Sequence, residues 1–283
     1  MKNSQQITRA MKFVAAARLR RAQEAALAAR PYARELARVL RSTMARIQEP
    51  QHPLLERREE KNVLAIVLTG ERGLAGAFNA NILRKANEFF RANRDKKVVT
   101  IPVGKKGRDA LKKAGFTFAS EWVNVLARVE FKSAREIAKL ATDLYAEKKV
   151  DSVYIIFSEF KSVMTSNLMV EKLLPVEAIR EEAGGNEEKE SGKNAEVQVD
   201  YIYEQPEAQL LDKLLPRYVE TQILRAMLES SASEYAARMT AMESATKNAG
   251  DVIEALTLYM NKVRQAAITK EIIEIVSGAS YGS

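Results

Sequence analysis

Residues 235–266 read YAARMTAMESATKNAGDVIEALTLYMNKVRQA, with apolar or small side chains recurring every three or four residues. The average step is close to 3.5 residues, the period of helices that supercoil around a partner. The pattern predicts a long helix whose apolar stripe, Leu256 included, is buried in a coiled coil. The stripe consists of Tyr235, Met239, Met242, Ala245, Ala249, Val252, Leu256, Tyr259, Val263 and Ala266.

The same helix is predicted to extend beyond this stretch in both directions. Between Arg217 and Val276 the only glycine is Gly250, and there is no proline. Sixty helical residues would make a rod of roughly 90 Å at about 1.5 Å per residue. A compact domain cannot bury a rod of that length, so a second rod must cover the stripe.

The N-terminal segment is the predicted second rod. Residues 4–48 contain no glycine and one proline, Pro31, and are rich in alanine, leucine and arginine, which are strong helix formers. We expect the two ends of the chain to form an antiparallel two-helix coiled coil with both termini at or near its tip. Apart from an interruption at Arg18, the apolar stripe of this segment consists of Ile7, Met11, Val14, Ala22, Ala25, Ala29, Tyr32, Leu36, Leu40, Met44 and Ile47.

The middle of the chain has a different pattern. Continuous apolar runs are typical of strands buried on both faces, and here they alternate with helical stretches, which favours a mostly parallel sheet. The expected fold class is therefore α/β, a long coiled coil plus a central Rossmann-like domain. The runs are 63–68, 98–103 and 153–157, the helices lie around 79–93, 105–114 and 134–148, and further strands are expected across 163–174 and 197–203.

Three parts follow from these patterns. We expect a coiled-coil helix over residues 1–57, a globular α/β domain over 58–208, and a second coiled-coil helix over 209–283. Within the globular part, the polar segment at about 181–195 has no apolar anchor, so it is predicted to be a mobile surface loop.

Composition excludes several kinds of site. The 283 residues include no cysteine and a single histidine, His52, so disulfides, thiolate metal sites and histidine clusters are excluded. The longest run without charge, 73–83, has 11 residues, whereas a membrane-spanning helix needs about 17–25 apolar residues. We expect no direct membrane insertion, and no metal or cofactor.

The net charge of +8 is concentrated in one segment. Residues 1–49 hold 11 basic and 3 acidic residues, and the remainder is neutral. This segment is predicted to meet an acidic surface. Arginine binds carboxylates and phosphates alike, so a nucleic-acid-binding or adaptor coiled coil is an open alternative. Few aromatic residues lie among these basic ones: Arg9, Lys12, Arg18, Arg20 and Arg21.

The most enzyme-like feature is the turn GERGLAG at 70–76, after the first predicted strand. Glycines there can cradle a phosphate, but the spacing matches neither the dinucleotide fingerprint nor a P-loop. We interpret it as a tight strand-to-helix connection and keep a nucleotide-using enzyme as an alternative. His52 is predicted to be exposed and Trp122 to be a core or partner contact. The sequence contains no set of residues that would bring together a nucleophile, a base and an oxyanion site. This predicts a non-catalytic mechanical or interaction protein.

Three segments carry a family resemblance. Residues 3–16, NSQQITRAMKFVAA, resemble the N-terminal helix of the γ subunit of F-type ATP synthases. RQAAITKE at 264–271, followed by Glu274, Gly278 and Ala279, is similar to that family's C-terminal signature, and the turn ERGLAG at 71–76 is similar to its conserved loop. The chain departs from the family at Glu71 (usually aspartate), at Ala75 (often cysteine) and in its last residues. It also begins almost at the first motif, as expected of a chain that lacks residues from its start.

The resemblance implies a central rotor shaft that carries torque from a membrane c-ring to catalytic sites on β subunits and regulates ATPase activity without being catalytic. Its implied partners are the α and β subunits, the ε subunit and the c-ring, and its implied place is the cytoplasmic face of the cell membrane. Arg264 and Gln265 would hydrogen-bond a loop of the surrounding subunits, and Thr269 and Arg238 would lie near that surface. Met11 would lie beside an acidic β-subunit loop, and Arg9, Lys12, Arg18, Arg20 and Arg21 would supply the positive face for such a loop.

Overall fold

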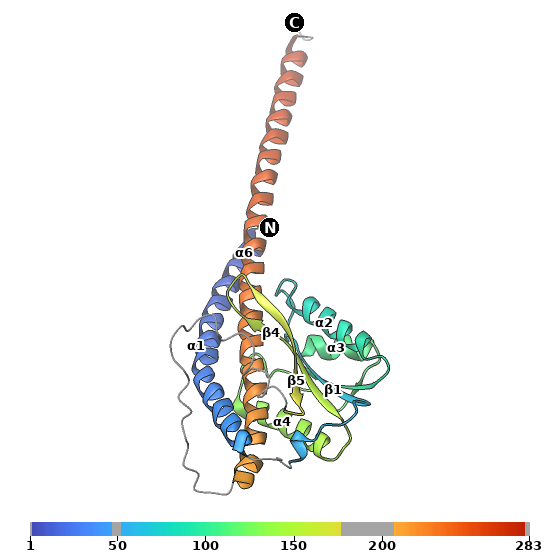
Figure 1. Cartoon of the computed structure of the whole chain (residues 1–283). Helices are drawn as coiled ribbons and strands as arrows, with labels where there is room; N and C mark the ends of the chain where they lie inside the picture. Colours follow the sequence, from blue (N-terminus) through green and yellow to red (C-terminus); the bar gives the residue numbers. More distant parts are fainter. Residues whose placement is uncertain (1, 47–51, 177–206, 281–283) are drawn as a thin grey trace, which may run out of the picture.

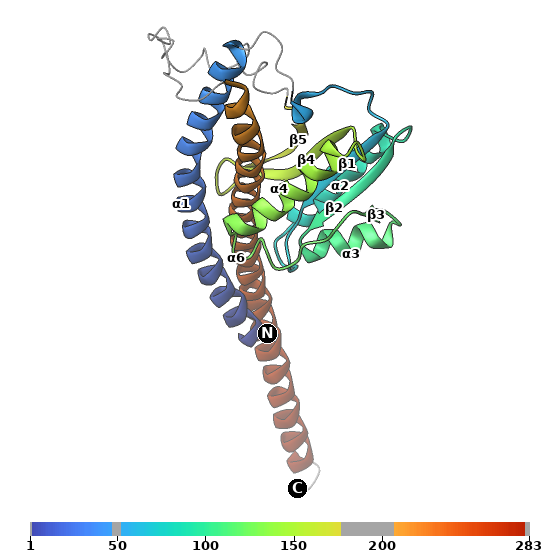
Figure 2. The same cartoon turned by 90° about the horizontal axis from the view of Figure 1, so that it is seen from below.

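A computed structural model describes residues 2–46, 52–176 and 207–280. Two helices from opposite ends of the chain, α1 (Lys2–Arg46) and α6 (Glu207–Ser280), run antiparallel beside an α/β domain. In both views α6 lies between α1 and this domain (Figures 1 and 2). The predicted fold class is confirmed.

Within the described residues, the sheet has five strands in the order β3-β2-β1-β4-β5. The pairs β3–β2, β2–β1 and β1–β4 are parallel, and β5 pairs antiparallel with β4. The expected strands 63–68, 98–103, 153–157 and 163–174 are confirmed, whereas the two-residue β3 was not anticipated. The predicted strand 197–203 and the predicted loop around 181–195 lie outside the described residues. The strands are β1 (Asn62–Leu68), β2 (Lys97–Val103), β3 (Thr117–Phe118), β4 (Ser152–Phe160) and β5 (Ser166–Leu174).

Helices cover both faces of the sheet, because alternate residues of each strand point to opposite sides. On one face, Leu64, Ile66 and Leu68 pack in the cluster that includes α4 and α6. On the other face, Ala65 and Val67 pack with residues of α2 and α3. The remaining helices are η1 (Pro53–Leu55), α2 (Phe78–Ala92), α3 (Lys105–Lys113) and α4 (Phe131–Ala146).

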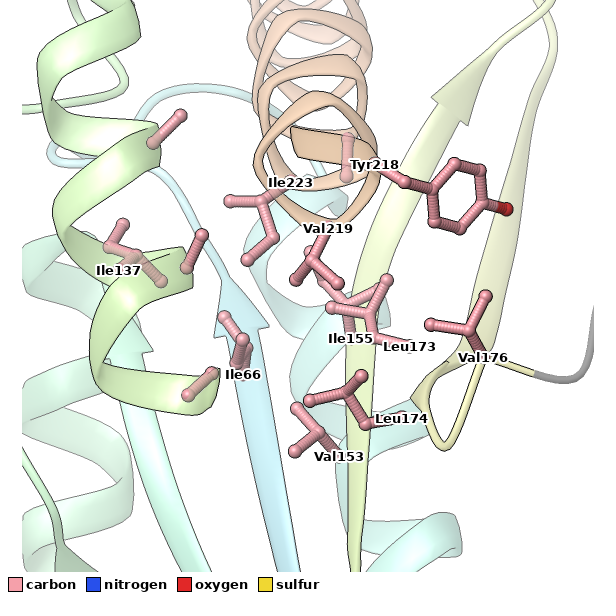
Figure 3. Close-up of a cluster of buried hydrophobic side chains, with 14 of the residues drawn as sticks. Ile66, Ile137, Val153, Ile155, Leu173, Leu174, Val176, Tyr218, Val219 and Ile223 are labelled. Atoms are coloured by element: carbon pink, nitrogen blue, oxygen red, sulfur yellow. The ribbon is translucent and has the colours of Figure 1, made fainter. Parts of the chain in front are cut away.

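The N-terminal half of α6, here called its lower half, is part of the core of the α/β domain. Val219 and Ile223 point from α6 toward Ile66 of β1 and Ile155 of β4 (Figure 3). Residues 226–236 of α6 are all buried, because α1 covers the side that the sheet does not. The shaft is therefore anchored by an apolar joint rather than tethered to the domain by loops alone.

The line along which α1 faces α6, here called the seam, follows the predicted period but partly different residues. The prediction was right at Leu36, Leu40 and Met44. It was wrong at Ile7, Val14 and Tyr32, which are 59%, 53% and 56% exposed, and at Ala25, which is also exposed. Ile47 lies outside the described residues. Most seam residues are alanines, because two backbones approach closely there, and the larger side chains lie outside. The described seam runs through Ala15, Leu19, Ala22, Ala26, Ala29, Ala33, Leu36 and Leu40, in alternating steps of four and three.

The C-terminal half of α6, here called its upper half, departs from the predicted coiled coil with both termini at its tip. α1 has 45 residues and α6 has 74, so α1 covers only part of the longer helix. The side-chain Nε2 of Gln5 donates to the Thr246 carbonyl at 3.5 Å, and a Cβ at Gly250 would lie 3.0 Å from the same nitrogen. The two termini are consequently far apart, with the start of α1 beside the middle of α6 (Figure 1).

Beyond Gly250, α6 continues alone. The predicted stripe is exposed here: Val252 by 42%, Leu256 by 49%, Tyr259 by 67% and Val263 by 48%. The expectation that Leu256 is buried within this chain was wrong, because the rod that was meant to cover it ends earlier. At about 1.5 Å per residue, residues 251–280 extend roughly 45 Å past the two-helix part.

Two leucine-to-alanine substitutions test this division of α6. Leu40 is fully buried in the seam, so Leu40→Ala should lower the free energy of unfolding by about 2–5 kcal/mol. Leu256→Ala should change it by less than about 0.5 kcal/mol in the isolated chain. Urea denaturation followed by circular dichroism gives both values. Equal losses would contradict the division into a packed half and a free half.

Candidate partner-binding surfaces

The free part of α6 is a candidate apolar surface for a partner. Its exposed large apolar residues are not confined to one side of the helix, so they cannot all be covered by a single neighbouring helix. They are Val252, Leu256, Leu258, Tyr259, Met260, Val263, Ile268, Ile272, Ile273 and Ile275. Because apolar side chains are unfavourable in water, a helix that exposes them on several sides is suited to being enclosed by another protein.

Three predicted site residues lie on this free part. Arg264, Gln265 and Thr269 are exposed. Arg264 donates a hydrogen bond to the side chain of Asn261, and the Thr269 hydroxyl donates to the Gln265 carbonyl at 2.9 Å. A partner-binding role for these residues stays a prediction.

The predicted basic face of α1 is partly used within the chain. Lys12 Nζ lies 2.6 Å from Glu243 Oε1 of α6, and Arg20 Nε lies 3.0 Å from Glu24 Oε1. The Arg18 guanidinium lies over the Tyr235 ring, 5.8 Å from its centroid. Arg9 and Arg21 are exposed. Exposed pairs such as Arg20–Glu24 contribute about 0–1 kcal/mol, so these side chains can be released to a partner at little cost.

A cavity of about 500 Å³ brings several predicted residues together between α1 and α6. Met11 and Arg18 of α1 line it opposite Tyr235 and Arg238 of α6, and Glu71 of the glycine-bearing turn closes one side. Sequence motifs that are more than two hundred residues apart thus meet at one point of the shaft.

Arg238 lies inside this region rather than on the free surface. Its side chain is 12% exposed; the guanidinium binds the Glu234 carboxylate and donates to the Gly73 carbonyl at 2.6 Å. Burial raises the pKa of Glu234 above its usual range, and the hydrogen bond from Arg238 opposes that rise.

The glycine-bearing turn is a tight connection, as predicted. Gly76 has a φ of +54° and Leu74 a φ of 64°, and α2 starts two residues later. A phosphate here would meet carboxylates: a Cβ on Gly70 would lie only 3.0 Å from the Glu234 carboxyl carbon, and Glu71 is adjacent. This arrangement disfavours the nucleotide-using alternative.

The sequence also gave predictions for the exposure of His52 and the role of Trp122. The prediction that His52 is exposed was wrong, because its side chain is 11% exposed and its Nδ1 accepts a hydrogen bond from the Leu54 amide at 3.1 Å. Burial lowers the pKa of His52, and Asp212 opposes that change. Trp122 packs against the main core cluster, one of its two predicted roles.

Across the described ranges, no cluster of three or more potential metal ligands occurs. In the same residues, no helix is long and apolar enough to cross a membrane.

Comparison with known proteins identifies the family. The model of the ATP synthase family matches residues 1–280. The ATP synthase gamma chain of Solibacter usitatus is 46% identical over 284 residues, which cover 99% of this chain and 94% of that relative. That of Desulforamulus reducens is 47% identical over 280 residues, with the same coverage. The chain belongs to the ATP synthase gamma chain family.

Solved structures of the family's assemblies have the same fold. The central stalk and c-ring structure of the Tetrahymena thermophila mitochondrial ATP synthase contains a chain with a TM-score of 0.63 and 24% identity, covering 85% of this chain and 99% of that one. A chain of the Euglena gracilis mitochondrial ATP synthase rotor has a TM-score of 0.56 and 19% identity, covering 95% and 100%. A long two-helix rod beside an α/β domain is thus common to this gamma chain and these structures.

Glu229 is a buried carboxylate on α6 that sequence reasoning missed. It is 4% exposed, and one of its oxygens has no hydrogen-bond partner among the described residues. Burial raises its pKa above the usual value of 4.5; Glu159 and Glu171 add to the rise, and Arg225 and Arg30 oppose it. The sequence signal is weak, since a glutamate among serines and alanines is ordinary on an exposed helix.

The raised pKa of Glu229 predicts a pH-dependent effect of Glu229→Gln. A carboxyl group with a pKa raised by folding stabilises the fold at low pH, and that contribution is lost as the pH rises through the folded value. Glu229→Gln should therefore raise the free energy of unfolding more at pH 7.5 than at pH 4.5. Urea denaturation at both pH values measures the difference, with the exposed Glu254→Gln as a control. An effect of Glu229→Gln that does not change with pH would contradict the prediction.

Proposed function

We propose that this chain is the central rotor shaft of an ATP synthase. In this role it carries torque from ion flow through a c-ring to catalytic sites on the β subunits, regulates their ATPase activity and performs no chemistry itself. Its partners are the α and β subunits, the ε subunit and the c-ring. The closely similar gamma chains support this assignment, since each covers nearly the whole of this chain.

The free half of α6 is the observation that carries the proposal. A helix exposed on all sides, with ten large apolar residues outward, fits inside a ring of subunits that surrounds it completely. Because α6 is a single helix there, its surface differs with direction, so each surrounding subunit meets a different face as the shaft turns. Stiffness and asymmetry are what a rotor supplies.

The α/β domain supplies the other end of the shaft. We propose that it holds the ε subunit and stands on the c-ring, which makes the chain a peripheral membrane protein on the cytoplasmic face of a bacterial cell membrane. The three-part division at residues 57/58 and 208/209 is part of this proposal. In this arrangement, the free part of α6 lies inside the ring of α and β subunits, and the part that is paired with α1 lies below that ring.

The site residues follow from this placement. We propose that Arg264 and Gln265 hydrogen-bond a loop of the surrounding subunits and that Thr269 lies beside that contact. Met11 faces an acidic loop of a β subunit, and the basic residues of α1 attract it. The family match favours a protein over a nucleic acid as the acidic partner. The basic residues concerned are Arg9, Lys12, Arg18, Arg20 and Arg21.

Co-expression with α and β subunits tests the function. ATP hydrolysis by the purified assembly should depend on this chain, which should co-purify in stoichiometric amount and show no hydrolysis alone. A chain ending at residue 250 keeps the apolar joint with the sheet and the seam with α1, so it should fold but fail to support coupled hydrolysis. Full activity of α and β subunits without any gamma chain, or with the shortened one, would overturn the proposal.

Neutralising the basic face tests the contact with the acidic loop. Replacement of its five residues by glutamine should alter the ATPase rate and its regulation while leaving assembly intact, because the attraction is lost but the apolar contacts remain. The variant Arg34→Gln/Arg38→Gln, which changes two exposed basic residues nearer the end of α1, is the control. Hydrolysis rates equal to those of the unsubstituted complex would count against this role of the basic face.

A further inference from the structure

The turn Gly70–Gly76, here called the shoulder loop, touches α6 at the point where the shaft leaves the α/β domain. Arg238 donates to its Gly73 carbonyl at 2.6 Å and binds Glu234 on the preceding turn of α6. A Cβ on Gly76 would lie 3.8 Å from the Ala241 Cβ. The loop therefore lies directly against one face of the shaft.

On its other side, the shoulder loop is bound to the helices of the domain. The Gly70 carbonyl accepts from the Lys106 amide at 3.1 Å, and Glu71 Oε2 accepts from the Lys105 amide at 3.0 Å, both at the start of α3. The Gly70 amide donates to Asn79 Oδ1 of α2 at 2.8 Å. The loop is thus the piece of backbone that links α6 to α2 and α3.

The Arg238 contact is the last side-chain hydrogen bond from the described part of the domain to α6 before the shaft continues upward. Below it, the domain holds α6 through a Ser158–Ser233 hydroxyl pair at 2.7 Å and through Tyr235, whose hydroxyl donates to the Ala127 carbonyl at 3.2 Å. Above it, the bonds of α6 to other elements go to α1, as between Lys12 and Glu243. When the free half of a rod meets resistance, the tie to the α/β domain that lies nearest that half carries the largest bending load among the ties to the domain.

We propose that Arg238 is a positioning residue that latches the shoulder loop to α6, so that the α/β domain and the shaft turn as one body. The torque part of this inference rests on the proposed function, whereas the latch itself does not. It differs from the role that the family resemblance implies for Arg238, a place near the contact with surrounding subunits.

The residue types at the latch fit this role. A guanidinium is planar and carries several donors, so it can bind a carboxylate and a carbonyl at once. Gly70 lets the loop approach, because a Cβ there would come within 3.0 Å of the Glu234 carboxyl carbon. A lysine at position 238 has a single ammonium group and cannot hold both partners in the same fork.

Amide hydrogen exchange on the full-length chain tests the latch without any other subunit. Loss of a hydrogen bond from a charged donor should raise the opening equilibrium of the loop by about tenfold. Arg238→Gln should therefore speed exchange by that factor at the hydrogen-bonded amides of Gly70, Phe78 and Lys105, whose bonds involve the loop or its neighbours. Exchange in the strands of the sheet should not change. Arg217→Gln is the matched control, because Arg217 lies on the same helix and bonds to Glu220 of that helix at 2.9 Å.

Two further variants make the outcome decisive. Arg238→Lys should give an intermediate increase in exchange, and it carries the test if Arg238→Gln does not fold. A reversible disulfide between cysteines introduced at Gly76 and Ala241 should restore slow exchange in the Arg238→Gln chain when it is oxidised. The 3.8 Å separation of the two Cβ positions matches disulfide geometry, and the chain has no other cysteine. Because a side chain at Gly76 is strained at a φ of +54°, the same cysteine pair in the chain that keeps Arg238 is the reference.

The assembled complex in vesicles tests the torque role. With Arg238→Gln, ATP-driven ion pumping should fall relative to ATP hydrolysis, and oxidation of the introduced disulfide should restore it. Restoration separates the latch from a partner contact, since a disulfide cannot replace a bond to another subunit. Unchanged loop exchange in both Arg238 variants would overturn the latch, and lost pumping that the disulfide does not restore would overturn the torque role. The co-expression experiment can fail independently of the exchange measurement, so the two proposals are separable.

Discussion

Burial of α6 on every side over residues 226–236 is the constraint on which the rest of the structure depends. A helix that is embedded between α1 and one face of the sheet cannot rotate or slide without breaking both contacts. The same helix then continues as the free rod, so its direction is set entirely by the embedded half. The long projection is useful only because its base is held by close packing, and close-packed interiors transmit strain rather than absorb it.

The sequence predicted the elements well because length and period are local properties. The apolar runs gave β1, β2 and β4, and the near absence of glycine and proline gave both long helices. The error at Val14 and Tyr32 has a local cause too: α1 carries apolar residues on more than one face, so a three-and-four spacing can be drawn in more than one register. A shift of one residue rotates the chosen face by about 100°.

Other features could not be predicted because they depend on residues far apart in the chain. The stripe through Leu256 was recognised, but periodicity shows that a surface is apolar without showing which molecule covers it. Both termini were expected at the tip on the assumption that the only available cover was α1. Likewise, the Arg238–Gly73 bond spans 165 positions, and no local pattern indicates it. The family resemblance suggested roles for residues such as Arg238, but their contacts could be seen only in the folded structure.

The buried polar residues of α6 fix its height against the α/β domain, and the Thr246–Thr8 hydroxyl pair fixes the height of α1 against α6. Alanine seams permit close approach, but every turn of such a helix resembles the next, so a slide by one heptad changes little apolar burial. Ser233 with Ser158, Tyr235 with the Ala127 carbonyl, and Arg238 with the Gly73 carbonyl each have a partner at one height only. A slide would leave these groups buried without partners, at about 1–3 kcal/mol each. Apolar packing thus gives the shaft its strength, and the polar contacts fix its position along the axis, as a single buried polar residue fixes register in coiled coils.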